Sequence, residues 1–251
     1  MDSNMDSYNL LFYSLLISEI PVLFFTILDL CKFESIKKYR ISYNNSNNKI
    51  IQRPYPTDQE LYIGFIEYLK ITFGILIPIS LCGVTFIKYI NFDFLDRSLN
   101  LSYIIGFLQL IELFIYSDIL FYGIHRIFHT PLLYHIHKKH HIYQTNSFSL
   151  INHCLEPLEL IIFMIPPILP AIILNLHISI MCMYILLANF IGTYIHSGYS
   201  FSYINCALLI DSKHHDIHHV KKIKNYGFGF LYSFSDKLFG TFLDYVDVRV
   251  V

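Results

Sequence analysis

The chain has 251 residues and a formal net charge of −1, and only 15% of its residues are charged while 54% are hydrophobic. These charges are too few to cover the surface of a soluble globule, so the composition excludes that class and indicates a membrane protein. The near-neutral balance gives no reason to expect a nucleic-acid partner. The five cysteines form no CxxC motif, which argues against a disulfide framework or a zinc knuckle.

Four apolar stretches follow one another along the chain, and each is long enough to cross a bilayer core, which requires about 20 helical residues. They cover residues 8 to 30, 71 to 90, 102 to 124 and 158 to 195. Pro21 predicts a kink in the first stretch. The last stretch is long enough for two crossings or a deep hairpin, and "IPPILP" at 165 to 170 predicts its bend or the start of its second arm. The sequence therefore predicts an all-α integral membrane protein with about four transmembrane helices, including one long hairpin.

The charges of the loops predict how the chain is threaded. The polar stretch 32 to 60, which includes the low-complexity segment "SYNNSNNK", has more basic than acidic residues, whereas residues 91 to 100 have one Arg and two Asp. By the positive-inside rule the first loop is cytosolic and the second is lumenal. The third span then returns to the cytosol with His125, and the final hairpin leaves and comes back. The histidine-rich segments are therefore predicted to form a cytosolic helical cap.

Eight histidines fall at helical spacings within three short boxes, "HRIFH", "HKKHH" and "HHDIHH". The first box has its histidines at i, i+4, and the other two repeat the set i, i+3, i+4. Residues with these spacings share one face of a helix, so they can chelate one ion without distorting the backbone. The members are His125 and His129, then His137, His140 and His141, then His215, His218 and His219, with His214 beside the last three.

The number and type of these side chains predict the metal. Neutral imidazole is the commonest protein ligand for borderline transition metals. Structural zinc uses four ligands and catalytic zinc three, so the boxes hold more ligands than one zinc requires. A two-metal cluster is the natural interpretation, and a nitrogen-rich site without thiolate indicates non-haem iron that handles O₂. The alternative, a pH sensor or a chance cluster, is disfavoured because the spacing recurs. His135 and His177 lie outside the repeated spacing and are not predicted ligands.

Two acidic residues are candidates for orienting the ligands. Asp118 shares a helical stripe with His125, and its carboxylate can accept the second N–H of a liganding imidazole. A structural hydrogen bond from Asp118 to another helix is the competing interpretation. Asp216 lies inside the third box and is the better candidate for supporting an imidazole. Glu156 and Glu159 are open to the same two interpretations.

The order and spacing of the boxes resemble the fatty acid hydroxylase and sterol desaturase superfamily, whose signature is HxxxH, HxxHH and HxxHH after membrane spans. The resemblance covers roughly residues 102 to 243. Within the superfamily, "FHTPLLYHIHKKHHIYQTNSFSL", "HSGYSF" and "HHDIHHVKKIKNYGFGFLYSFSDKLFGT" are most similar to the cholesterol 25-hydroxylases. The first 100 residues show no specific match. We therefore expect an N-terminal membrane region at 1–100 and a catalytic domain at 101–251.

The resemblance implies a di-iron centre that uses O₂, with electrons from NADPH or NADH through a reductase and a membrane partner such as cytochrome b5. It also implies an endoplasmic reticulum membrane location. It adds His196 of "HSGY" as a ligand, with His214 as a weaker candidate. The implied ligand set is His125, His129, His137, His140, His141, His196, His215, His218 and His219.

Two departures from related enzymes narrow the expected reaction. Methylsterol oxidases usually show His-Pro-Leu-Glu where this chain has "EPLE" at 156 to 159, and fatty acid 2-hydroxylases usually carry a histidine where Gly192 stands. The expected reaction is therefore hydroxylation of a sterol side chain. A methylsterol C4 oxidase and a sterol C5 desaturase-type enzyme remain alternatives within the superfamily. From other classes we consider a membrane zinc hydrolase, which the absence of HExxH disfavours, and a non-catalytic sterol-binding membrane protein.

Overall fold

The computed structural model is helical apart from one short pair of strands in the residues that it describes. These residues are 7–44, 50–89, 103–143, 146–208, 210, 212–227 and 230–244. Within them, four helices are long and apolar enough to cross a membrane, with bounds Asn9–Cys31, Asp58–Gly83, Tyr103–Phe128 and Ile178–His196. The predicted fold class is confirmed. The side of the membrane that each loop faces stays a prediction.

The first span consists of two helices, α1 (Ser7–Ser18) and α2 (Ile20–Cys31), which are separated at Glu19. Pro21 lies in the first turn of α2, where its missing N–H removes no hydrogen bond within that helix. The helix is thus interrupted where the sequence predicts a kink. Large apolar side chains of α2 such as Phe24 are exposed, as expected of a surface that contacts lipid.

The second span begins earlier than the predicted range of 71 to 90. It consists of α4 (Asp58–Ile71), the π-helical turn η1 (Thr72–Leu76) and α5 (Ile77–Tyr89). The start is set by a capping box, in which Thr57 Oγ1 accepts a hydrogen bond from the Glu60 backbone N–H at 3.2 Å. Hydropathy alone misses this start because the first turn of α4 carries the acidic residues Asp58 and Glu60.

The polar segment between these spans has more structure than the sequence predicts. It contains α3 (Glu34–Lys37) and the antiparallel strands β1 (Ser42–Asn44) and β2 (Ile50–Gln52), with Ser42 opposite Gln52. The predicted loop "SYNNSNNK" therefore begins as a strand, because its first residues pair with β2. Residues 45–49 and the predicted lumenal loop at 91 to 100 lie outside the described residues.

The third span is α6 (Tyr103–Phe128), which extends about one turn beyond the predicted 102 to 124 and so contains His125. The last apolar block forms α8 (Pro157–Phe163), α9 (Ile165–Ile173) and α10 (Ile178–His196). The chain turns back at 174 to 177, where Asn175 has φ 52°. The predicted bend at the prolines is therefore wrong. Pro166 lies in the first turn of α9, where a missing N–H needs no partner, so the prolines separate α8 from α9 instead.

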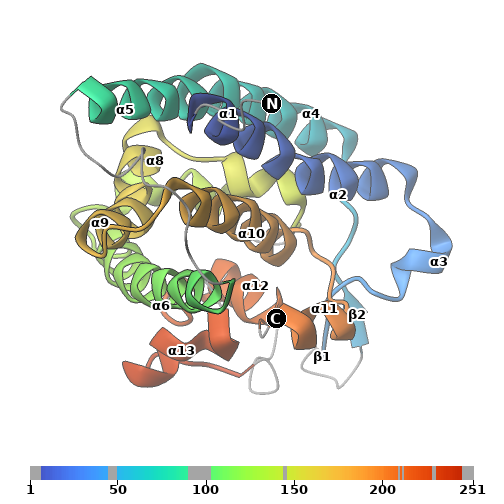
Figure 1. Ribbon diagram of the computed structural model, residues 1–251. Helices are drawn as coiled ribbons and strands as arrows, with labels where there is room; N and C mark the ends of the chain where they lie inside the picture. Colours follow the sequence, from blue (N-terminus) through green and yellow to red (C-terminus); the bar gives the residue numbers. More distant parts are fainter. Residues whose placement is uncertain are drawn as a thin grey trace.

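Short helices complete the described chain. They are α7 (Tyr134–His137), the 3₁₀ turns η2 (His140–Ile142) and η3 (Ser149–His153), α11 (Ser202–Leu208), α12 (Ser212–Lys221) and α13 (Phe230–Leu238). Helix α10 lies at the centre, with α1 and α2 packed on one side of it and α6 and α12 on the other (Figure 1). Buried apolar side chains of α1, α6 and α10, such as Leu15, Leu113 and Met181, fill the space between these helices. This packing brings the C-terminal ends of α6 and α10 together beside α12.

Candidate metal centre

Nine histidines converge where α6 and α10 end, and they form two groups. The five-histidine group contains His125, His129, His137, His141 and His218, and the four-histidine group contains His140, His196, His215 and His219. Within each group the facing nitrogen atoms all lie within 4.8 Å of one another. The structure thus brings together every residue of the ligand set that the resemblance implies.

Each HxxHH box contributes to both groups. In the second box His137 and His141 belong to the five-histidine group, while His140 belongs to the four-histidine group. In the third box the division is reversed, because His215 and His219 join the four-histidine group and His218 joins the other. The two groups therefore lie side by side and share the segments that carry them.

The distances between ring nitrogens suit ligands of a common ion. In the five-histidine group, His125 Nε2 lies 3.0 Å from His137 Nε2, and His141 Nε2 lies 2.9 Å from His137 Nε2. In the four-histidine group, His196 Nε2 lies 2.9 Å from His215 Nε2. Adjacent nitrogens on an octahedral ion with metal–nitrogen bonds of about 2.1 Å are about 3.0 Å apart. The donor atoms therefore fit an ion in each group.

Hydrogen bonds to main-chain oxygens set the tautomer of three of these rings. His125 Nδ1 donates to the Tyr226 carbonyl at 2.6 Å, His218 Nδ1 to the Lys224 carbonyl at 2.8 Å, and His196 Nδ1 to the Gly192 carbonyl at 2.6 Å. A neutral imidazole that carries its proton on Nδ1 has a bare lone pair on Nε2. His125 and His218 thus direct two bare lone pairs into the same group, which is an arrangement that a cation would stabilise.

Burial keeps the imidazoles neutral, which is the form that binds metal. Burial lowers the pKa of His129 to about 4. Burial also lowers the pKa of His215, His218 and His219 well below the ordinary value, and the neighbouring imidazoles add to this effect. No proton therefore competes with a metal ion for these nitrogens at neutral pH.

Four other histidines lie apart from both groups. His153 of η3 is buried, with its Nε2 3.6 Å from Glu19 Oε2. His214, the weaker candidate, is buried, stacks on Phe242 and has Nε2 3.4 Å from Asp236 Oδ2. His135 is exposed. His177 caps the start of α10, where its Nδ1 accepts a hydrogen bond from the Ser179 N–H at 3.1 Å.

The two carboxylates predicted to support ligands have other partners. Asp118 accepts a hydrogen bond from Ser235 Oγ on α13, which matches the competing interpretation of a bond to another helix. Asp216 forms a buried ion pair with Arg53, with Arg53 Nη2 2.9 Å from Asp216 Oδ2, and also accepts a hydrogen bond from Ser147 Oγ. Both residues therefore hold elements together around the histidines.

Glu159 is an acidic residue that contacts one of the nine grouped histidines directly. Its Oε1 accepts a hydrogen bond from His137 Nδ1, and both side chains are fully buried. Its Oε2 accepts a hydrogen bond from the Glu156 N–H at 3.3 Å, which belongs to the capping box at the start of α8. The sequence left this residue open, because only the packing of α8 against α7 brings it to His137.

Residues 224 to 227, called the carbonyl strap below, supply the Lys224 and Tyr226 oxygens that hold His218 and His125. The strap is anchored by Asp236, which accepts hydrogen bonds from the Tyr226 N–H at 2.8 Å and the Gly227 N–H at 2.7 Å. Asp236 also accepts a hydrogen bond from Thr241 Oγ1 at 2.7 Å. A main-chain carbonyl that supports a ligand can come from any residue type, so the sequence does not reveal it. The one signal in the sequence is that Asp236 and Thr241 lie in the segment "DKLFGT".

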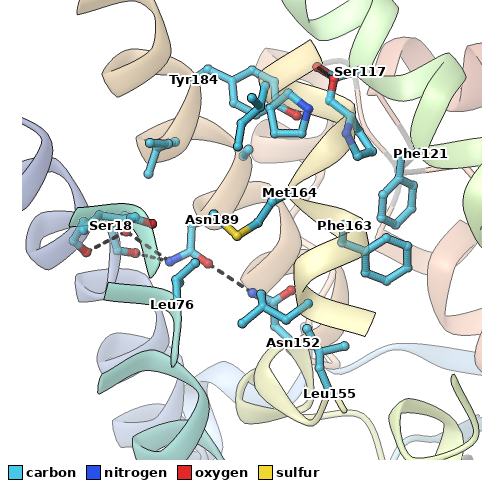
Figure 2. Close-up of a pocket in the computed structure, with 18 of the residues that line it drawn as sticks. Ser18, Leu76, Ser117, Phe121, Asn152, Leu155, Phe163, Met164, Tyr184 and Asn189 are labelled. Carbon is cyan, nitrogen blue, oxygen red and sulfur yellow. Dashed lines mark hydrogen bonds between the residues drawn. The ribbon is translucent and has the colours of Figure 1, made fainter. Parts of the chain in front are cut away.

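An apolar cavity of about 420 Å³ is lined by members of both histidine groups and by residues of α10. Its histidine end is lined by His125 and His137 of the first group and by His140, His196 and His215 of the second. Its walls are mostly aliphatic and aromatic and include Phe121, Phe163 and Met164 (Figure 2). The cavity volume lies in the range of small-molecule sites.

The chain is similar in sequence to known proteins. The family model described as fatty acid hydroxylase matches residues 110–241. Fatty acid hydroxylase ahd1 of Mycosarcoma maydis is 35% identical over 114 residues, which are 44% of this chain and 28% of that protein. Fatty acid hydroxylase domain-containing protein 2 of Homo sapiens is 35% identical over 123 residues, which are 47% of this chain and 35% of that protein.

A plant protein matches over a longer stretch. Very-long-chain aldehyde decarbonylase GL1-11 of Oryza sativa subsp. japonica is 31% identical over 150 residues, which are 57% of this chain and 55% of that protein. The matches thus span less than two thirds of the length of each of these relatives. No solved structure matches. Because the family match covers more than half of the chain and includes all nine grouped histidines, the protein belongs to the fatty acid hydroxylase family.

Proposed function

We propose that the two histidine groups each hold an iron ion and that the protein hydroxylates a C–H bond of a lipid, on the side chain of a sterol. The observation that carries the proposal is the shared end of the cavity, where histidines of both groups form the wall. A lipid in this cavity presents a C–H bond to both groups at once. The names of the relatives, fatty acid hydroxylase and very-long-chain aldehyde decarbonylase, agree with a long apolar substrate.

A bound di-iron pair would supply the oxidising power for an unactivated C–H bond, with O₂ and external electrons. The balanced reaction converts R–H, O₂, two electrons and two protons into R–OH and water. The electron donor we propose is a reductase that uses NADPH or NADH and acts through a partner such as cytochrome b5. The location we propose is the endoplasmic reticulum membrane, with the histidine groups on the cytosolic side, as the basic loop at 32 to 60 predicts.

The residues of the chain have three tasks in this reaction. The Nδ1 hydrogen bonds of His125, His196 and His218 hold the rings so that their Nε2 atoms face the groups. The apolar walls exclude water from the reacting carbon. Glu159 keeps the proton of His137 on Nδ1, which leaves its Nε2 bare.

Metal analysis of matched histidine variants tests the proposal. Wild-type protein and His135→Ala, whose side chain is exposed and outside both groups, are expected to hold about two iron ions per chain. His218→Ala in the first group and His215→Ala in the second are each expected to lose about one ion and almost all turnover. Iron should be supplied during expression, because zinc also binds imidazole.

Turnover is measured with sterols, O₂ and the electron donors in membranes, and the products are identified by mass. A product with one added oxygen on the side chain supports the proposal. Unchanged iron content and turnover in both His218→Ala and His215→Ala would overturn it. Oxidation of a methyl group on C4 would instead favour the methylsterol oxidase alternative, and loss of two hydrogens from ring carbons would favour the C5 desaturase alternative.

A further inference from the structure

The cavity is long, and its described walls carry no basic side chain of lysine or arginine, although the Asp118 carboxylate lies among them. Along α10 its lining extends from Ile178 to His196, a rise of about 27 Å at about 1.5 Å per helical residue. A negatively charged group in the middle of this cavity would have no cation beside it, which is costly in an apolar surrounding.

A polar side-chain pair interrupts the apolar wall between the two ends. Asn152 of η3 and Asn189 of α10 both line the cavity, and Asn152 Nδ2 donates to Asn189 Oδ1 at 3.1 Å (Figure 2). Asn189 Nδ2 in turn donates to the Ser18 carbonyl at 2.7 Å, at the interruption between α1 and α2. Polar groups at this depth need partners, because unpaired ones are costly in an apolar surrounding.

The direction of this chain of amides follows from its last acceptor. A main-chain carbonyl can only accept, so the atom of Asn189 beside Ser18 must be Nδ2, and Oδ1 must face Asn152. The atom of Asn152 that faces Asn189 is then Nδ2, and Asn152 Oδ1 is left over. Among the described residues no side chain or main-chain group hydrogen-bonds to Asn152 Oδ1. This oxygen and the second Nδ2–H of Asn152 are available at the cavity wall.

We propose that the Asn152 amide binds the hydroxyl group of a neutral lipid alcohol in the cavity. A hydroxyl donates one hydrogen bond and accepts others, so it matches both the free Oδ1 and the free N–H of Asn152. A carboxylate can only accept hydrogen bonds, so the Oδ1 lone pairs of Asn152 would repel it. No lysine or arginine on the described walls would neutralise its charge. The inference rests on the proposed function in one respect, since it takes this cavity as the substrate site.

A pair of probes that differ only in the hydroxyl tests this subsite. The full chain, purified in detergent, binds tritiated cholesterol, which is displaced by unlabelled cholesterol, by its 3-deoxy analogue cholest-5-ene or by oleate. One net hydrogen bond predicts that wild-type protein binds cholesterol roughly three- to tenfold more tightly than cholest-5-ene. Asn152→Leu is expected to abolish this preference by weakening cholesterol binding alone. Met164→Leu, an apolar change in the same wall, is expected to retain it.

Each outcome decides the matter. Equal displacement by cholesterol and cholest-5-ene in wild-type protein overturns the inference without any variant, and so does oleate as the stronger competitor. A preference that persists in Asn152→Leu also overturns it. Unchanged affinity of Asn152→Leu for cholest-5-ene shows that the cavity is intact in the variant and supports the inference. Binding requires neither iron nor electrons, so failure to oxidise sterols would count against the proposed function alone.

Discussion

Arg53 donates from both Nε and Nη2 to Asp216 Oδ2, at 3.1 and 2.9 Å, and thereby joins the loop after the first span to the third histidine box. Both side chains are buried. Burial lowers the pKa of Arg53 only to about 10, so the guanidinium is charged at neutral pH. Because Asp216 follows His215 on α12, this ion pair positions the helix that contributes to both histidine groups.

Arg53→Ala is expected to destabilise the protein by about 3–5 kcal/mol, because it leaves the buried Asp216 carboxylate without its cation. The free energy of unfolding in detergent measures the effect. Lys37→Ala is the control, since the Lys37–Glu34 pair is at the surface with 3.3 Å between the charged atoms. Its loss should change stability by no more than about 1 kcal/mol. Equal effects of the two substitutions would contradict the positioning role of Arg53.

Glu159→Ala is expected to weaken metal binding by about ten- to a hundredfold, because His137 loses the acceptor that orients its ring. Glu159→Gln keeps an oxygen that can accept from His137 Nδ1 and should lose much less. Competition with a chelator of known affinity measures both variants. If the Gln and Ala variants lose the same affinity, the Glu159 oxygen does not orient the ring.

Asp236→Ala is expected to loosen the carbonyl strap and so to affect the five-histidine group selectively. The strap holds His125 and His218, both of that group, whereas none of its described residues hydrogen-bonds to a ring of the four-histidine group. Titration with Co²⁺, followed by visible absorption, should show one of two binding steps weakened by about ten- to a hundredfold. The exposed Asp58→Ala is the control for the loss of a carboxylate. Equal weakening of both steps would refute the selective role.

Gly198→Ala is expected to be far more damaging than Gly240→Ala, although both glycines have positive φ, 75° and 70°. A Cβ at Gly198 would lie 2.5 Å from the Ser147 carbonyl oxygen and 2.7 Å from Arg40 Nη1, whereas one at Gly240 meets nothing within 4 Å. Gly240→Ala should therefore cost only the left-handed backbone strain, about 1–2 kcal/mol. Gly198→Ala should add a clash that the buried surroundings cannot relieve. Thermal unfolding midpoints of the two variants give the comparison.

Removal of metal is expected to destabilise the folded protein. Bare Nε2 lone pairs that face one another repel when no cation lies between them. An ion that binds only the folded state, at a concentration a thousandfold above its Kd, raises the free energy of unfolding by about 4 kcal/mol. A chelator should therefore lower the thermal unfolding midpoint of wild-type protein. The double variant His215→Ala, His218→Ala lacks a ligand in each group and should respond little to the chelator. An unchanged wild-type midpoint would count against bound metal.

Local patterns in the sequence determined the class of the protein and the members of its candidate site. Hydropathy indicated the four spans because a bilayer crossing requires a continuous apolar helix, a property of neighbouring residues. The i, i+3, i+4 spacing identified eight of the nine grouped histidines, since it reports which residues share one helix face. His196 has no such neighbour, and only the resemblance to known enzymes indicated it.

Only the tertiary structure decided how these residues are divided and supported. The spacing cannot show that His140 and His141 face different groups, because the division depends on where α6, α10 and α12 meet. In the sequence Arg53 counted only as one of the basic residues that predict the side of the membrane for the loop 32 to 60. Its burial against Asp216 follows from packing between distant segments. The support of His137 by Glu159 and the free Asn152 oxygen have the same origin. Helical periodicity is a local property, whereas the partner of a buried polar group is set by contacts between segments far apart in the chain.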